Sequence, residues 1–318
     1  MAPIEPAPHT PVLLDDVVRL LAPERGGFFV DATLGAGGHA AGILAGGDRA
    51  RVLGIDRDPH ALALARERLS RFGDRVALVE GDFADLDAIL EGDAYPAPDG
   101  ILADLGVSSM QLDDAGRGFS FRRDGPLDMR MGRSGRSAAE IVATATVDEL
   151  TRIFRDFGEE RMAAKIARGI VTERNRGPIA STRQLARIVA GEKGSREKID
   201  PATRVFQALR IEVNQELVAL ARFLAAAVAR ANGGGRLAVI SYHSLEDRIV
   251  KDTFRRESGV CLCPPRLPAC TCGARTALRV LTRRPIRPSE FEQRRNPRSR
   301  SARLRVAEKL PTAIPISA

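Results

Sequence analysis

The sequence of 318 residues contains no tryptophan, only two tyrosines, and 4% aromatic residues in total. Proteins that hold nucleic acids mainly by stacking need several aromatic side chains on one surface, so extensive base stacking is not expected of this chain. The sequence also lacks any apolar run near the roughly 20 residues that a membrane-spanning helix requires. Its first residues, MAPIEPAPHTPVLL, contain neither a basic region nor a long apolar stretch, unlike a secretory signal. We therefore expect a cytoplasmic protein with no membrane partner.

Cysteine is scarce, and all four cysteines lie in one short segment, CLCPPRLPACTC. Disulfide bonds are not expected in a cytoplasmic protein. Four thiolates on a tight, proline-containing hairpin can bind zinc tetrahedrally, although C-x-C spacing is less usual than C-x-x-C. The sequence leaves open whether this segment holds a structural zinc ion or no metal. The candidate ligands are Cys261, Cys263, Cys270 and Cys272.

The basic residues are unevenly distributed along the chain. There are 49 Lys and Arg against 41 Asp and Glu, a net charge of +8. Residues 275–305 hold 11 Arg with only Glu290 and Glu292 against them, and the rest of the chain has 38 basic and 39 acidic residues. Guanidinium groups match phosphate oxygens in shape and charge, so this segment favours contact with a nucleic acid. A solvated, partly disordered basic tail is the alternative.

Strand-like and helix-like segments alternate over the first 105 residues. The helix-like segment 59–73 has Pro59 near its first turn and Gly73 at its end, which is a common pattern at helix ends. The alternation predicts an α/β fold with a parallel, doubly wound sheet. The four predicted strands are residues 26–35, 51–58, 75–82 and 98–106.

The alternation stops after the fourth strand. The next clear strand pattern, residues 235–242, begins about 130 residues later, whereas a βαβ unit needs roughly 30. The gap predicts an inserted, mainly helical substrate-recognition domain over residues 109–231. Residues 1–108 and 232–318 then form one discontinuous domain around the sheet.

One long helix is predicted near the end of the insert, capped by Asp200, opened by Pro201 and ending near Gly233. Its apolar side chains fall on one narrow stripe that should face a core. These are Phe206, Leu209, Val213, Leu217 and Leu220. After the fifth strand, Ser244 is predicted to cap a further helix.

The stretch FFVDATLGAGGHA, residues 28–40, has the pattern of a buried strand followed by a glycine-rich turn and a helix. Gly35, Gly37 and Ala40 fit the dinucleotide pattern G-x-G-x-x-G/A, which is weak evidence when it stands alone. Asp56 lies 21 residues after Gly35, at the end of the second strand, where a carboxylate commonly binds ribose hydroxyls. A simple turn or cap residue is the alternative for Asp56.

Further acidic residues separate the possible nucleotides. Asp31 precedes the glycines, Asp82 with Phe83 ends the third strand, and Asp104 ends the fourth. An acid followed by an aromatic residue suits adenine, because the acid accepts a hydrogen bond from the exocyclic amine and the aromatic ring lies against the base. The whole set resembles a class I S-adenosylmethionine (SAM) methyltransferase with a Rossmann-like sheet, in which the turn meets no pyrophosphate. An NAD(P)-dependent oxidoreductase is the alternative, although no residue for hydride chemistry can be identified.

Longer motifs make the resemblance more specific, and they extend from about residue 9 to residue 305. They include DATLGAGGH, GIDRDP, DLGVSSMQLDDAGRGFSFRRDGPLDMRM, FGEERMAAKIARGIV, ISYHSLEDRIVK and RRNPRSRSARLRV. Together they resemble the bacterial 16S ribosomal RNA cytosine-N4 methyltransferases, the ribosomal small subunit methyltransferase H family. The resemblance implies SAM as cofactor and a decoding-region cytidine of 16S rRNA, within the small ribosomal subunit, as substrate. A non-catalytic, ribosome-associated RNA-binding protein is a further alternative, and a homodimer is compatible with the sequence.

The resemblance also implies which residues form the site. The cofactor-binding residues that it implies are Gly37, Gly38, His39, Asp56, Phe83, Asp104 and Gln111. Asp104 is the first candidate for a catalytic residue, because a carboxylate there can accept a hydrogen bond from the reacting amine. His243, in the SYHS motif after the fifth strand, is the second candidate, as a proton acceptor. Many amino-methyltransferases have D/N/S-P-P-Y/F after strand four, and this chain has Asp-Leu-Gly-Val.

Overall fold

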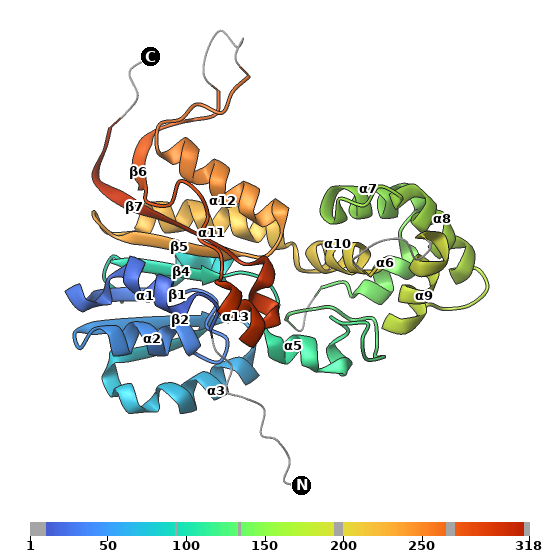
Figure 1. Cartoon of the computed structure of the whole chain (residues 1–318), viewed down its shortest axis with the longest axis horizontal. Helices are drawn as coiled ribbons and strands as arrows, with labels where there is room; N and C mark the ends of the chain where they lie inside the picture. Colours follow the sequence, from blue (N-terminus) through green and yellow to red (C-terminus); the bar gives the residue numbers. More distant parts are fainter. Residues whose placement is uncertain (1–10, 93, 133–134, 194–199, 265–270, 315–318) are drawn as a thin grey trace. The chain divides into compact units, whose positions relative to one another are not determined.

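The computed structural model describes residues 11–92, 94–132, 135–193, 200–264 and 271–314 (Figure 1). The chain divides into two compact units, and the first contains the glycine-rich turn. Unit 1 is Met1–Gly106 with Ala219–Ala318, and unit 2 is Val107–Val218. None of the helices in the described part of the chain has both the length and the apolar character needed to cross a membrane.

Unit 1 is built on a seven-stranded sheet with the order β3-β2-β1-β4-β5-β7-β6. The first five strands in this order are parallel, and β7 runs antiparallel to both β5 and β6. This arrangement confirms the predicted class I SAM methyltransferase fold with its Rossmann-like, doubly wound sheet. The strands are β1 Gly27–Asp31, β2 Ala50–Asp56, β3 Val76–Glu80, β4 Gly100–Asp104, β5 Arg236–Ser241, β6 Thr276–Val280 and β7 Arg303–Ile314.

Helices cover both faces of this sheet. Successive side chains of a strand point to opposite faces, so Phe29 packs with α1, α2 and α3, whereas Val30 packs with α4, α11 and α12. Figure 1 shows α1 and α2 on one side of the sheet and α11 and α12 on the other. The helices are α1 Leu14–Leu21, α2 Gly38–Gly46, α3 Pro59–Leu69, α4 Leu86–Ile89, α11 Glu216–Arg230, α12 Ser244–Glu257 and α13 Glu290–Arg295.

Unit 2 has its own apolar core, formed by helices and by the loop that precedes them. Phe119 and Phe121 of that loop belong to this core, and the Phe121 ring packs against Phe206 at 4.8 Å. Thr146 and Glu149 form a capping box at the start of α7. The helices are α5 Ser109–Asp113, α6 Ala138–Thr144, α7 Val147–Gly158, α8 Ala163–Arg174, α9 Thr182–Lys193 and α10 Thr203–Asn214.

The predicted long helix over residues 200–233 is wrong, because the chain forms two helices, α10 and α11. Gln215 between them has left-handed backbone angles, φ 51° and ψ 36°. The Asn214 side chain donates to the carbonyl of Met129 and accepts from the N–H of Met131, both over 2.8 Å. These two bonds tie the end of α10 to the preceding loop of unit 2.

The break also explains why the two ends of the predicted stripe separate. Phe206 lies in the core of unit 2, whereas Leu220 lies in the core of unit 1. Apolar periodicity marks a buried face but does not say which core buries it. Because α11 packs in unit 1, unit 2 ends at Val218, whereas the predicted insert extends to residue 231.

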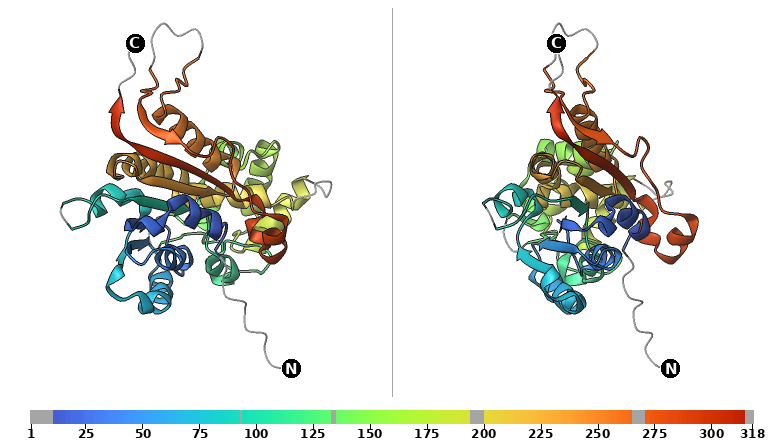
Figure 2. Two further views of the ribbon diagram at one scale, coloured as in Figure 1. Left: turned by 60° about the vertical axis from the view of Figure 1, so that its left-hand side comes forward. Right: turned by 90° about the vertical axis from the view of Figure 1, so that its left-hand side faces the viewer.

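The arginine-rich segment 275–305 is folded in its described form, so the disordered-tail alternative is wrong. It supplies β6, α13 and the start of β7, and Figure 2 shows β7 lying along the sheet. Arg305 is 8% exposed, and its Nε and Nη2 atoms donate to Asp247 at 2.6 and 3.1 Å. At least one arginine of the segment is thus a structural residue.

Candidate cofactor site and active site

The glycine-rich turn connects the carboxyl end of β1 to the start of α2. Gly35 and Gly37 have positive φ angles of 53° and 75°, which residues with a Cβ rarely adopt. A Cβ on Gly37 would press against Leu69 of α3 at 3.1 Å, whereas a Cβ on Gly35 would meet nothing within 4 Å. The turn is therefore packed on its Gly37 side and open on its Gly35 side.

Asp56, at the end of β2, holds the open side of this turn in place. Its Oδ2 accepts from the backbone N–H of Gly35 at 2.8 Å, and its Oδ1 accepts from the N–H of Asp58 at 2.9 Å. Burial raises the pKa of the Asp56 carboxyl above its ordinary value. Each carboxylate oxygen has a second lone pair, so these backbone bonds leave acceptor capacity for a ligand.

Asp31, the last residue of β1, is a buried carboxyl with one unused oxygen. The side chain is 1% exposed, and Oδ1 accepts from the Thr33 N–H at 3.3 Å. Oδ2 has no hydrogen-bond partner among the described residues. Burial raises the pKa of Asp31 to about 6. Buried polar atoms are nearly always paired, so this oxygen indicates a missing donor or cation beside the turn.

His39, in the first turn of α2, is buried and neutral near pH 7, because burial lowers its pKa. Its Nε2 lies 2.9 Å from the carbonyl oxygen of Val12. A carbonyl only accepts, so Nε2 carries the proton and Nδ1 carries a lone pair. That Nδ1 lies 3.8 Å from Oδ2 of Asp104. The contact is not an ion pair, because the imidazole carries no charge.

Asp104, at the end of β4, is held from several sides. Its backbone N–H donates to Thr33 Oγ1 at 2.6 Å, and the Tyr242 hydroxyl donates to its Oδ1 at 2.8 Å. Burial raises the pKa of Asp104 to about 7, and burial likewise raises the pKa of Tyr242 well above 10. The Asp104 side chain keeps 23% of its surface exposed, so a substrate can reach it.

Of the other two residues expected at the cofactor, Phe83 belongs to unit 1 and Gln111 to unit 2. The Phe83 ring packs edge-on against Phe223, with 5.3 Å between centroids. Gln111 is buried, and its Oε1 accepts from the Ser108 N–H at 3.1 Å. The structure thus gathers Gly37, Gly38, His39, Asp56 and Asp104 around one turn. Contact of Gln111 with the cofactor stays a prediction.

The predicted cap at Ser244 is wrong, because His243 is the N-cap residue of α12. Its Nδ1 accepts from the Glu246 N–H at 3.4 Å, while Oε2 of Glu246 accepts from the Tyr242 N–H at 2.8 Å. The His243 Nε2 lies 3.0 Å from Glu246 Oε1 but outside hydrogen-bonding geometry. Nδ1 is therefore used in capping, and a catalytic role for His243 stays a prediction.

Sequence reasoning had not assigned Thr33 or Val12, and it had not paired Tyr242 with Asp104. Thr33 lies within the DATLG motif and Tyr242 directly follows β5. A polar residue at the carboxyl end of a parallel strand is a usable signal, because such ends meet at one edge of the sheet.

The cysteine-rich segment brings three sulfur atoms together. The Sγ atoms of Cys261, Cys263 and Cys272 all lie within 4.8 Å of one another, and those of Cys261 and Cys272 are 3.8 Å apart. The backbone N–H of Thr271 donates to Cys263 and lowers the pKa of that thiol. Cys270, the fourth candidate ligand, lies outside the described residues.

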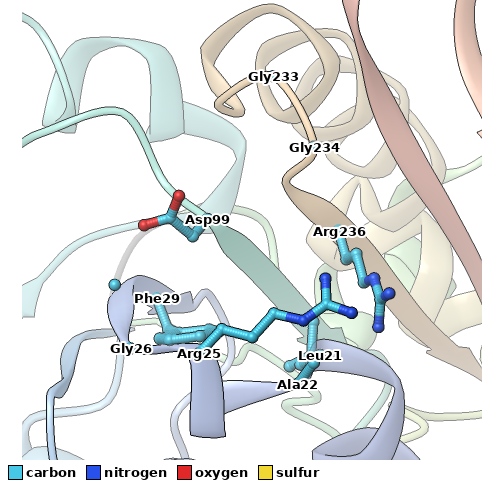
Figure 3. Close-up of a pocket in the computed structure, with 10 residues that line it drawn as sticks. Leu21, Ala22, Arg25, Gly26, Phe29, Asp99, Gly233, Gly234 and Arg236 are labelled. Carbon is cyan, nitrogen blue, oxygen red and sulfur yellow. The ribbon is translucent and has the colours of Figure 1, made fainter.

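A separate pocket of about 270 Å³ lies at the other end of the strands (Figure 3). Its lining includes Arg25, Asp99 and Arg236, which lie near the starts of β1, β4 and β5. Ligands of doubly wound sheets bind outside the carboxyl ends of the strands. This pocket is therefore distinct from the site at the glycine-rich turn.

The comparisons with known proteins agree with the geometry. Residues 6–310 match the model of the MraW methylase family. Ribosomal RNA small subunit methyltransferase H from Thermomicrobium roseum is 55% identical, and the alignment covers 95% of this chain and 94% of that protein. The protein of the same name from Trichlorobacter lovleyi is 53% identical, with 95% and 98% covered. A solved rRNA methylase structure from Streptococcus thermophilus is 12% identical, with a TM-score of 0.39 over 93% of each chain.

Proposed function

This chain belongs to the MraW methylase family, and we propose from this premise that it methylates the exocyclic N4 of a cytidine in 16S rRNA. It is a SAM-dependent methyltransferase. The relatives named above act on small-subunit ribosomal RNA, which supports the same class of substrate here. We propose that the target is the decoding-region cytidine and that the assembled small subunit presents it. A homodimer stays a prediction.

The observation that carries the proposal is the acidic edge of the sheet. Asp31, Asp56 and Asp104 end three neighbouring strands around a turn that is open at Gly35. SAM carries a positive sulfonium and an ammonium group, which suit carboxylates and the unused Oδ2 of Asp31. A dinucleotide would place its negative pyrophosphate at this turn. These carboxylates therefore fit SAM. Together with the family membership, they argue against the nicotinamide alternative.

The residues of the turn would hold the cofactor in complementary ways. We propose that Asp56 accepts from the ribose hydroxyls and that the half-buried Phe83 lies against the adenine. The open Gly35 side lets the cofactor approach the turn. Gly37 and Gly38 stay predicted contacts at the start of α2, and the N–H of His39 in the first helical turn suits a carboxylate. When bound, SAM supplies an electrophilic methyl group, and the protein supplies orientation and electrostatics.

Asp104 is the proposed catalytic residue. The lone pair of a cytidine N4 is delocalised into the ring, so the neutral amine is a weak nucleophile. An ionised Asp104 accepts a hydrogen bond from this amine and favours its pyramidal, more nucleophilic form. The N4 lone pair forms the new N–C bond, the methyl–sulfur bond breaks, and the N4 proton then leaves to Asp104 or to water. No strong base is needed, because the proton leaves after attack.

The test is a methyl-transfer assay with the purified full-length chain and labelled SAM. The substrates are small ribosomal subunits that lack this modification and, in parallel, naked 16S rRNA. Mass spectrometry of the digested RNA should show label in N4-methylcytidine at one site. SAM binding without label in either RNA would reject this activity and would favour a non-catalytic RNA-binding protein.

We also propose a structural zinc ion at the cysteine-rich segment. Tetrahedral zinc with Zn–S bonds of about 2.3 Å places its sulfur ligands about 3.8 Å apart. The Cys261 and Cys272 sulfurs have this separation, and Cys263 lies within reach. The sequence offers Cys270 as a fourth thiolate, outside the described residues.

A further inference from the structure

Eight of the 11 arginines of segment 275–305 fall into two groups. Arg275, Arg279, Arg303 and Arg305 form ion pairs with Glu257, Glu308 and Asp247. Those arginines connect β6, β7 and α12 within unit 1. The second group is exposed and gathers on α13 and on the 3₁₀ helix Pro297–Ser301 that follows it, and within it Arg294 pairs with Glu290 of its own helix at 3.5 Å. We call Phe291, Arg294, Arg295, Arg298 and Arg300 the α13 platform.

Phe291 is the unusual member of the α13 platform. It is 65% exposed. The guanidinium carbon of Arg295 lies 5.4 Å from the centroid of its ring. A single exposed apolar side chain is ordinary on a protein surface. An exposed aromatic ring beside one arginine, on a segment with further exposed arginines, has the composition of a single-stranded nucleic acid contact, in which a base stacks and guanidinium groups meet phosphates.

The α13 platform stands at the edge of the sheet that carries the active site. Glu292, the next residue after Phe291, accepts from the backbone N–H of Leu13 at 2.8 Å. Its carboxylate is near enough to influence the titration of His39 and Tyr242. Figure 1 shows α13 beside the carboxyl ends of the strands of unit 1. α13 therefore lies at the same edge of the sheet as Asp104.

We propose that the α13 platform binds the single-stranded rRNA next to the target cytidine, with one unpaired base stacked on Phe291 and the flanking phosphates on the arginines. This inference rests on the proposed function and adds the surface that grips the substrate. A base reaches an active site by flipping out of its stack or by lying in a single-stranded region. In a single-stranded region its neighbours are also unpaired and able to stack on protein. The exposed ring favours RNA over an acidic protein, because a base can stack on the ring while the guanidinium groups bind phosphates.

The first experiment compares Phe291→Ala with Phe291→Tyr, which keeps the ring. Loss of one stacked base should raise KM for the RNA substrate about tenfold. Both kcat and SAM affinity should stay within about twofold of the wild type. Phe291→Tyr should keep KM for the RNA substrate close to the wild-type value. An unchanged KM in Phe291→Ala, in a chain with the wild-type melting temperature, would overturn the proposal.

The second experiment measures how binding of a fluorescent single-stranded rRNA fragment depends on salt. Arg295→Gln should reduce the slope of log K against log salt by about one, because one phosphate contact is lost. Arg71→Gln is the matched control, because Arg71 is also exposed and lies 4.8 Å from the centroid of the Phe72 ring. An equal change in both variants would show a general charge effect and would reject a specific contact at the α13 platform.

These outcomes separate the α13 platform from the proposed function. If Phe291→Ala weakens RNA binding as expected but the wild type transfers no methyl group, the activity alone is rejected. If the wild type methylates RNA and Phe291→Ala does so with the same KM, the α13 platform alone is rejected. If Phe291→Ala weakens binding to whole subunits but not to the naked fragment, the contact is with a ribosomal protein, and stacking on RNA is also rejected.

Discussion

The Tyr242 hydroxyl donates a hydrogen bond to Oδ1 of Asp104 over 2.8 Å and so joins the ends of β5 and β4. The bond fixes one carboxylate oxygen and leaves Oδ2 facing the lone pair of His39 Nδ1 at 3.8 Å. A lone pair repels an ionised carboxylate but accepts from a protonated one. Burial and the Glu246 charge oppose the ionisation of Asp104, and the Tyr242 hydrogen bond supports it.

We expect the activity of the wild-type chain to fall in mild acid. Burial raises the pKa of Asp104 to about 7, and the ionised carboxylate is the stronger acceptor for the cytidine amine. Below that pKa, kcat/KM for SAM should fall about tenfold for each pH unit. Asp104→Asn should show a rate lower by about 10²–10³ and no titration in this range. A wild-type profile that stays flat between pH 5.5 and 8.5 would contradict the assignment.

Tyr242→Phe should move this acidic limb to higher pH. The phenol hydrogen bond lowers the pKa of Asp104, against the larger effect of burial, so its removal raises that pKa. The variant should lose activity at pH 7 and regain most of it at pH 9, whereas a purely structural defect would reduce the rate equally at both. The measurement is the pH profile of kcat/KM, with melting temperatures recorded at each pH.

Asp104 should also destabilise the folded chain at neutral and alkaline pH. A carboxyl whose folded pKa is raised from 3.8 to about 7 stabilises the fold fully below pH 3.8, and this contribution is lost as pH rises toward 7. Asp104→Asn removes the ionisation and keeps an acceptor for Tyr242. It should therefore exceed the wild type in stability by roughly 1–3 kcal/mol at pH 8, a range reduced because the side chain is 23% exposed. Urea unfolding at pH 4 and pH 8 tests this, and a difference independent of pH would reject it.

The sequence predicted the sheet and the residues at its strand ends, because each strand end is encoded locally by an apolar run followed by a polar residue. It did not predict the Tyr242–Asp104 bond, since that contact needs β4 and β5 to be neighbours although more than 100 residues separate them. It also missed the break at Gln215. The apolar stripe continues past that residue. The break is accompanied by long-range hydrogen bonds, in which the Asn214 side chain donates to the Met129 carbonyl and accepts from the Met131 N–H.

Removing the metal should test the proposed zinc site. The chain purified without added metal should contain about one zinc ion per chain, measured by elemental mass spectrometry. Cys272→Ser should lose most of this zinc. Thr271→Val is the control, because it removes a hydroxyl beside Cys263 and keeps every thiol. Chelation should lower the melting temperature of the wild type and leave Cys272→Ser unchanged. A wild-type chain without bound zinc would reject the site.

The structural arginines should behave differently from those of the α13 platform. Asp247 pairs with both Arg303 and Arg305, and its loss would leave the buried Arg305 charge unpaired. Asp247→Ala should therefore lower the free energy of unfolding by about 3–5 kcal/mol. The control is Arg279→Ala. The Arg279 side chain is 63% exposed in its pair with Glu308, so this substitution should cost at most about 1 kcal/mol. Urea unfolding measures both. Equal effects in the two variants would mean that burial of Arg305 does not set the strength of its pair. The buried side of this basic segment would then contribute no more to the fold than its exposed side.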